Sequence, residues 1–162
     1  MSDATVDALS PAERDDLRAV ARYQFGAGAG DALIGAADGA TRRRSGRIDR
    51  LYAGPERVAT LTTAGRFTLG LAGGRALREA GAAPAWRVTV DAEAAPFVAG
   101  GETAFAKFVE RVDPQTRPRD EVLVVDAEDE LLAVGRAALS ASAMVAFDRG
   151  VAVDVREGVE TG

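Results

Sequence analysis

The pattern of apolar and polar positions divides the first half of the chain into helices around a group of strands. A helix is predicted from Ser10 to about Gln24, because serine caps the first turn, Pro11 fits the first helical position and Glu13 completes a capping box. Alternating stretches then predict two or three antiparallel strands with glycine-containing turns, and a short helix ends at Gly81. The strands are expected within residues 46–53, 56–64 and 65–72, and the closing helix at 73–81.

The second half alternates over short stretches and predicts a small, partly closed barrel with one or two short helices. Its first strand places Trp86, Val88 and Val90 at alternate positions. A serine-capped helix near the end is expected to turn Met144 and Phe147 inward. The predicted elements are a strand at 86–91, a helix at 92–101, a strand at 108–113, a turn at 114–120, two strands within 121–139, a helix at 140–150 and a strand at 151–158.

The composition narrows the possible chemistry. The chain of 162 residues has no cysteine and no histidine. This excludes disulfides, thiolate metal sites, a cysteine nucleophile and the most common general base. A small enzyme would need a catalytic carboxylate in a cleft, and no paired carboxylates have a recognisable catalytic spacing. We therefore expect neither catalysis nor a cofactor.

The net charge of −5 combines Asp and Glu with a basic set that is almost wholly arginine, since Lys107 is the single lysine. This bias predicts a protein of an extremely halophilic archaeon, although a GC-rich genome would also replace lysine by arginine. At about 1 M salt the Debye length is only about 3 Å. A partner would then be held by short contacts, such as bidentate arginine pairs and stacking.

The charge is divided unevenly. Residues 1–85 carry a balance of +2 and residues 86–162 a balance of −7, and residues 81–85 have the composition of a short linker. We expect a small α+β domain at 1–85, a barrel domain at 86–158 and a tail at 159–162. No signal peptide and no run of roughly 18 apolar residues is visible, which predicts a cytoplasmic protein without a membrane segment.

The second half resembles a PUA domain, the RNA-binding module named after pseudouridine synthases and archaeosine transglycosylases. The resemblance rests on a helix ending in VAGG, then AFAKFVERVDPQTRPRDEVLVVD, ELLAVGRAAL, a helix with an inward Met144, and GVAVDVREG. One departure is Arg119, where the family often has glycine, so that a tight turn is altered and a positive charge is gained. The resemblance implies a PUA-type pseudo-β-barrel.

The first half is similar to the domain that precedes PUA in archaeal tRNA-guanine transglycosylases and in archaeosine synthase, through RYQFGAGAGDALI, RSGRI and RFTLGLAGGRAL. Both resemblances together cover residues of roughly 12–158, which leaves no room for the catalytic barrel of the transglycosylases. They imply an RNA-binding protein, with tRNA as the expected RNA, that serves archaeosine-type tRNA modification without catalytic activity and docks onto a modifying enzyme. The alternative is an interaction module that docks onto such an enzyme without binding RNA, which the acidic second half favours.

The resemblance also implies a role for Lys107. In PUA domains the loop and strand after the first helix form part of the RNA-facing surface. Gly100 and Gly101 would let the backbone approach a phosphate closely, and Lys107 would bind that phosphate as a point charge. On composition alone, an ordinary exposed lysine is the simpler interpretation.

Further arginines are candidate RNA contacts. Arg117 and Arg119 lie in one turn, and Arg136 and Arg149 lie where PUA domains place RNA-facing residues; surface pairing with neighbouring acids is the alternative for each. The stretch TRRRSGRIDR, residues 41–50, holds five arginines and one acid. It is expected to track RNA phosphates, unless it is an exposed loop or pairs with the acidic half. Its candidate residues are Arg42, Arg43, Arg44 and Arg47.

Two stretches are given structural interpretations. GAGAGD, residues 26–31, follows a helix rather than a strand and lacks the spacing of a dinucleotide loop. We interpret it as a turn that redirects the chain, with phosphate contact as the weaker alternative. Asp126, Glu128, Asp129 and Glu130 cluster in a hairpin turn, where a solvated acidic turn is favoured over a divalent-cation site.

Overall fold

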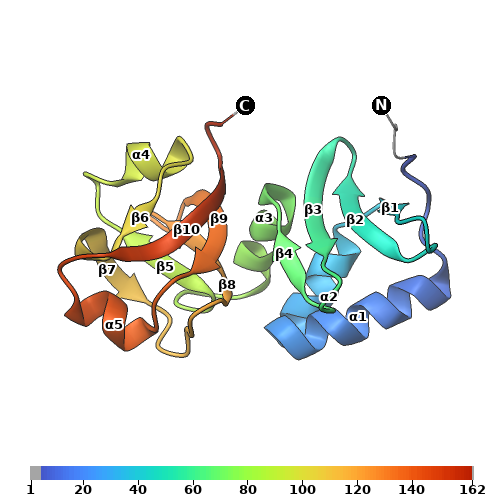
Figure 1. The fold of residues 1–162 in the computed structure, drawn as a ribbon, viewed down its shortest axis with the longest axis horizontal. Helices are drawn as coiled ribbons and strands as arrows, with labels where there is room; N and C mark the ends of the chain where they lie inside the picture. Colours follow the sequence, from blue (N-terminus) through green and yellow to red (C-terminus); the bar gives the residue numbers. More distant parts are fainter. Residues whose placement is uncertain (1–4, 162) are drawn as a thin grey trace. The chain divides into compact units, whose positions relative to one another are not determined.

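A computed structural model describes residues 5–161 of the chain (Figure 1). The backbone divides into two compact units, residues 1–81 and residues 82–162. Within the described residues, the first unit combines α-helices with a four-stranded sheet, and the second wraps a six-stranded sheet around its own core. This architecture confirms the α+β class. None of the helices that the structure describes is long and apolar enough to cross a membrane.

Helix α1, Pro11–Phe25, begins as its capping box predicts. The backbone N–H of Ser10 donates to the Glu13 carboxylate at 2.9 Å, and the N–H of Glu13 donates to the Ser10 hydroxyl at 3.1 Å. The buried face of the helix is formed by Leu17, Ala21 and Phe25. The predicted first helix is therefore confirmed together with its cap.

Helix α2, Ala27–Gly35, occupies the stretch that the sequence pattern suggested as a turn. That prediction holds only for Gly26, which has a φ of 95° and reverses the chain between the two helices. Among the small residues that follow, Gly30 serves close packing. A Cβ on Gly30 would lie 2.4 Å from the backbone nitrogen of Arg22, so α1 and α2 approach through this glycine.

The sheet of the first unit has the order β1-β2-β3-β4, with every neighbouring pair antiparallel. Strand β1, which the sequence pattern did not indicate, precedes the three predicted strands. Helix α3 follows them and packs on β3 through Gly73, where a Cβ would lie 2.1 Å from the Val58 carbonyl oxygen. The bounds are β1 Gly39–Arg42, β2 Ile48–Ala53, β3 Glu56–Leu61, β4 Phe67–Leu69 and α3 Leu71–Ala80.

The sheet of the second unit has the order β6-β10-β9-β8-β5-β7 and forms a nearly closed barrel. Strands β5 and β8 are parallel, and the other neighbours are antiparallel. The 3-10 helix η1 links the two edge strands β6 and β7. The bounds are β5 Arg87–Val90, β6 Ala104–Phe105, η1 Ala106–Phe108, β7 Val109–Val112, β8 Glu121–Val125, β9 Leu131–Ala137 and β10 Val151–Gly158.

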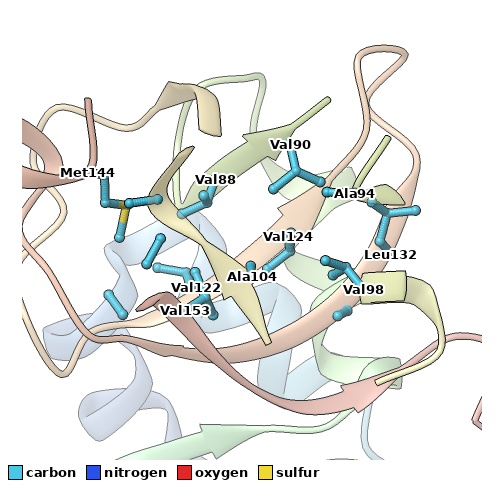
Figure 2. Close-up of a cluster of buried hydrophobic side chains, with 14 of the residues drawn as sticks. Val88, Val90, Ala94, Val98, Ala104, Val122, Val124, Leu132, Met144 and Val153 are labelled. Carbon is cyan, nitrogen blue, oxygen red and sulfur yellow. The ribbon is translucent and has the colours of Figure 1, made fainter. Parts of the chain in front are cut away.

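Two short helices lie at opposite ends of the barrel core. Figure 2 shows Met144, from α5 (Ala141–Ala146), at one end of the buried cluster and Val98, from α4 (Ala95–Ala99), at the other. Met144 is fully buried as predicted, but Phe147 lies beyond the end of α5 and is 52% exposed, so its predicted inward position is wrong. The predicted strand β5 is present with Val88 and Val90 buried, but the intervening Arg87 and Thr89 are buried as well, so this strand has no exposed face.

Candidate nucleic-acid interface

Two ion pairs in the second unit use arginine for structure. Arg87, at the start of β5, donates from Nε and Nη2 to the carboxylate oxygens of Asp129 at 2.6 and 3.1 Å, and its side chain is 2% exposed. Arg156 on β10 donates to both oxygens of Glu121 on β8, whose side chain is 4% exposed, at 2.7 and 2.8 Å. Buried charges are tolerated when they are paired and hydrogen-bonded in this way. Both arginines are therefore committed to the fold.

The acidic hairpin turn is also structural. Asp126 accepts hydrogen bonds from the backbone N–H groups of Glu128 and Glu130 at 2.9 and 3.0 Å, and Asp129 holds Arg87. No group of acids that could hold a metal ion occurs among residues 5–161. These contacts agree with the interpretation as a hairpin turn.

Five basic residues lie at one end of the barrel sheet, which we call the basic end: Lys107, Arg117, Arg119, Arg136 and Arg149. Strand β8 begins at this end, β9 ends there and β10 begins there. Arg136 lies on β9 between Glu121 on β8 and Asp154 on β10 in the strand register. The turn that carries Arg117 and Arg119 is joined to the next residue of β9, because the N–H of Arg119 donates to the Ala137 carbonyl at 2.7 Å.

The remaining two members of the basic end come from segments in direct contact. The N–H of Ala106 donates to the carbonyl of Gly150 at 2.9 Å, which places η1 with Lys107 beside the loop with Arg149. The Lys107 ammonium lies 4.9 Å from the centre of the Phe108 ring. Such a contact contributes about 0.5–1 kcal/mol at an exposed site and leaves the charge in place.

All five basic-end side chains belong to exposed residues, and none of them forms an ion pair with any acid of the described chain. The alternative that the sequence left open for these arginines, pairing with nearby acids, is therefore not what the structure shows. Asp120, for example, accepts from the backbone N–H of Arg117 at 2.9 Å rather than from a guanidinium. The five cations thus form no ion pairs among the described residues, although exposed Asp154 lies opposite Arg136 in the strand register and exposed Asp148 precedes Arg149.

Gly100 and Gly101 are not brought together with Lys107. They follow α4 and pack against the far end of β10, where a Cβ on Gly158 would lie 2.3 Å from the Ala99 carbonyl and 2.6 Å from the Gly101 nitrogen. Strand β10 has eight residues, which at about 3.3 Å each separates its ends by roughly 23 Å. The two glycines therefore serve the packing of the chain on itself, away from the basic end.

Arg119 adopts a φ of 77°, a conformation that glycine favours and that arginine rarely takes. The family that the second half resembles often has glycine at this position. A side chain held in the left-handed region costs about 1–2 kcal/mol. Strain of this kind often accompanies a functional requirement.

The arginine-rich stretch of the first unit contains both arginines that are paired with acids and arginines that are not. Arg42 donates to Glu13 at 2.8 and 3.0 Å and pairs with Asp7, and these contacts raise the pKa of Arg42 through the Glu13 hydrogen bond first. Arg43 donates to the Leu61 carbonyl at 2.6 Å and pairs with Asp49 at 3.1 Å. Arg44 and Arg47 make no side-chain contact of this kind within residues 5–161, so of the four candidate residues these two are available for a ligand.

Three more arginines have exposed side chains that lack an ion pair within the described residues: Arg50, Arg66 and Arg111. Arg50 belongs to the arginine-rich stretch but was not among its candidate residues, and the sequence pattern did not single out Arg66 and Arg111 because neither belongs to a cluster along the chain. A signal for Arg66 was nevertheless present. It follows Gly65 in a turn between two predicted strands, as Arg47 follows Gly46.

An open, mainly apolar groove of about 540 Å³ lies between α5 and β7. Its apolar walls include Val112 and Val145, and Val145 is 61% exposed. Phe147, which is also exposed, directly follows the end of α5. The second unit thus has a non-polar surface feature as well as the basic end.

Two family models match the chain. The model of the PUA domain matches residues 86–159, and the model of the patch-forming domain C2 of tRNA-guanine transglycosylase matches residues 15–84. Curated relatives include the tRNA-guanine(15) transglycosylase of Methanothermobacter thermautotrophicus, which is 42% identical over 96% of this chain and 23% of its own length. The enzyme of the same name from Pyrococcus furiosus is 45% identical over 89% of this chain and 24% of its own length. The chain spans about a quarter of the length of these relatives.

Solved structures share the fold. A conserved PUA domain protein from Thermoplasma acidophilum has a TM-score of 0.67 at 19% identity, and a hypothetical protein from Pyrococcus horikoshii OT3 has a TM-score of 0.73 at 20% identity. Each match covers 96% of this chain and 95% of the other. These likenesses support the architecture of both units.

Proposed function

Since the chain carries a PUA domain over residues 86–159, preceded by a patch-forming C2 domain over residues 15–84, we propose that it binds tRNA as an accessory factor in tRNA modification of the archaeosine type. The observation that carries the proposal is the basic end, where five cations lack acidic partners while Arg87 and Arg156 are paired. The name of the relatives, tRNA-guanine(15) transglycosylase, supports tRNA as the RNA.

Recognition is expected to proceed by backbone and shape rather than by a base code. Lysine and arginine contacts to phosphate position a protein on RNA without reading its sequence, and structured RNA is bound mostly in this way. The basic end offers point charge from Lys107 and planar guanidinium groups from its four arginines. Affinity should therefore depend steeply on salt.

The chain is proposed to lack catalytic activity and to act beside an enzyme. It contains neither histidine nor cysteine, and its Asp129 and Glu121 carboxylates are engaged with arginine. In this proposal the domains are residues 1–85 and 86–158 with a tail at 159–162, the protein works in the cytoplasm, and a halophilic origin remains a prediction from composition.

The test is binding of bulk archaeal tRNA, measured by fluorescence anisotropy across a KCl series. The double variant Lys107→Ala, Arg119→Ala is expected to bind at least tenfold more weakly than the wild type at the same salt. The control is Arg18→Ala, Arg75→Ala, which removes two positive charges that the structure pairs with Asp15 and Glu56. Equal losses in both variants, or no binding by the wild type, would contradict the proposed site.

A second candidate is a protein-interaction module, which the groove between α5 and β7 favours. In that case a transglycosylase-type enzyme lacking this region would be retained by the chain, and Val145→Asp would abolish retention. Binding of tRNA would be absent and would not respond to Lys107→Ala. The two candidate functions therefore predict different losses. RNA binding predicts that the Lys107→Ala, Arg119→Ala variant loses tRNA, and protein interaction predicts that Val145→Asp loses the enzyme.

A further inference from the structure

Two hairpin turns of the first unit have the same geometry. In the β1–β2 turn the N–H of Arg43 donates to the Arg47 carbonyl at 2.8 Å, and the N–H of Gly46 donates to the Arg43 carbonyl at 2.9 Å. The β3–β4 turn repeats this pattern with Thr62, Gly65 and Arg66, at 2.8 and 2.9 Å. The glycines have φ values of 88° and 81°. In each turn an arginine therefore follows a left-handed glycine.

Both turns lie at the same end of the sheet. The order β1-β2-β3-β4 is antiparallel throughout, so β1 and β3 end where β2 and β4 begin. Arg43 ties the turns together by donating from Nη2 to the carbonyl of Leu61, the last residue of β3. Because neighbouring strands lie about 4.8 Å apart, the centres of the two turns are separated by about 10 Å.

The side chains on these turns are exposed and unneutralised. Arg44, Arg47 and Arg66 have no ion pair or side-chain hydrogen bond within residues 5–161. The nearby carboxylate of Asp49 is occupied by Arg43. Of the remaining arginines in the stretch, Arg42 is held by Glu13. The ends of the two turns thus carry three free guanidinium groups and no free acid from the arginine-rich stretch.

We propose that the two turns form one phosphate-binding surface, in which Arg66 on the β3–β4 turn acts together with Arg44 and Arg47 on the β1–β2 turn. The ligand is the phosphodiester backbone of RNA. This assignment rests on the proposed RNA binding and adds a second contact region, in the first unit. Its new element is Arg66, which lies far from the arginine-rich stretch in sequence and is placed beside it by the sheet.

The chemistry favours phosphate over a protein partner. Guanidinium groups form bidentate hydrogen bonds with phosphate oxygens, and glycine leaves room for close approach at each turn. The rigid hairpins restrict the backbone, so that binding orders mainly the arginine side chains. The surface has no large apolar side chain in either turn, since residues 43–47 and 62–66 contain none.

The experiment measures the binding of bulk tRNA by the full chain as a function of KCl. Each phosphate contact contributes about 0.7–0.9 to the slope of log affinity against log salt. Arg66→Ala is therefore expected to lower the slope by about that amount, and the Arg44→Ala, Arg47→Ala, Arg66→Ala variant to lower it further. Arg66→Lys, which keeps the charge, should retain most of the slope.

The matched control is Arg75→Ala. It makes the same change in net charge, but Arg75 pairs with Glu56 at the start of β3, at the opposite end of the same sheet. A slope of Arg66→Ala equal to that of the wild type or of Arg75→Ala would overturn the two-turn surface while leaving the proposed function intact. A wild-type chain that binds no tRNA would instead remove both proposals.

Discussion

One turn geometry occurs in both units with opposite charge. The turn between β8 and β9 repeats the hydrogen bonds of the two turns in the first unit, with Asp126, Asp129 and Glu130 at the equivalent positions. Asp129 has a φ of 63°, where the first unit has Gly46 and Gly65. The first unit therefore leaves arginine exposed after a glycine, and the second replaces that glycine by an acid that binds buried Arg87.

The comparison shows why the net charge of a unit is a poor guide to its surface. Several acids of the second unit satisfy backbone N–H groups in turns: Asp91 accepts from Ala94, Asp113 from Trp86 and Gln115, and Asp120 from Arg117. Such bonds are a common use of aspartate in turns and caps. These three acids are therefore engaged with the backbone, and none of them forms an ion pair with the cations of the basic end.

The largest expected effect tests the acid in this turn. Asp129→Gly should destabilise the chain by about 3 kcal/mol, because it removes the carboxylate from an arginine whose side chain is 2% exposed. This loss should outweigh the relief of the positive φ. The free energy of unfolding is measured by urea denaturation followed by circular dichroism.

The corresponding variant in the first unit is Gly65→Asp. It places an acid at the equivalent turn position, but the described part of that unit has no buried arginine for this acid to pair with. It should cost only about 1 kcal/mol, the strain of a left-handed residue. If Asp129→Gly were neutral or stabilising, the Arg87–Asp129 ion pair would contribute nothing to the free energy of unfolding. The turns would then differ only in whether their charged side chains are exposed.

The next effect tests how the first unit is held together. Gly30→Ala should destabilise by about 2 kcal/mol, because its Cβ would meet the backbone of α1 at Arg22. Gly28→Ala, on the same helix, has no atom within 4 Å and should stabilise by about 0.5–1 kcal/mol. Thermal unfolding of both variants provides the measurement. Equal effects of the two substitutions would show that α1 and α2 do not depend on close contact.

A smaller effect separates stability from binding at the basic end. Arg119→Gly should keep or raise the free energy of unfolding, by up to about 1 kcal/mol, because glycine accepts the φ of 77°. Arg119→Ala keeps the strain and should bring no such gain. Both should weaken tRNA binding to a similar extent. A gain in stability without loss of affinity would mean that Arg119 is strained for a reason unrelated to RNA.

Much of the fold follows from local signals. The capping box at Ser10, the acidic hairpin and the predicted strands of the second half each appear in the structure. The failures have tertiary causes. Helix α2 is rich in glycine, and one of these residues, Gly30, lets it pack closely on α1. Strand β1 is too short to show a period. Phe147 follows the predicted helical face, but the helix ends at Ala146.

The candidate site was only partly accessible from sequence, because pairing depends on the fold. Arg42 and Arg44 are equivalent by sequence, yet Glu13 from α1 occupies only the first. Gly100 and Lys107 are close in the chain but lie toward opposite ends of β10. Arg66 joins Arg47 only because β1 and β3 end together. The arrangement of the strands decides which arginines and lysines lack an ion pair. The sequence alone does not reveal that arrangement.

The smallest expected effect is a dependence of stability on pH in the first unit. The Ser10 N–H, and then Arg42, lower the pKa of Glu13 below its ordinary value of 4.5. Because folding depresses this pKa, the interaction stabilises the chain fully above the unfolded value and is lost as the pH falls through the folded one. Thermal midpoints should therefore decrease below about pH 4.5.

Glu13→Gln should flatten that decrease, since a neutral side chain keeps the capping hydrogen bond but does not titrate. The matched control is Asp16→Asn, an exposed acid on the same helix with no ion pair in the described chain. It should leave the acid limb of the stability curve unchanged. If both variants flattened the curve equally, general repulsion among the positive charges at low pH would govern acid stability, and the paired arginines of the first unit would contribute little to it.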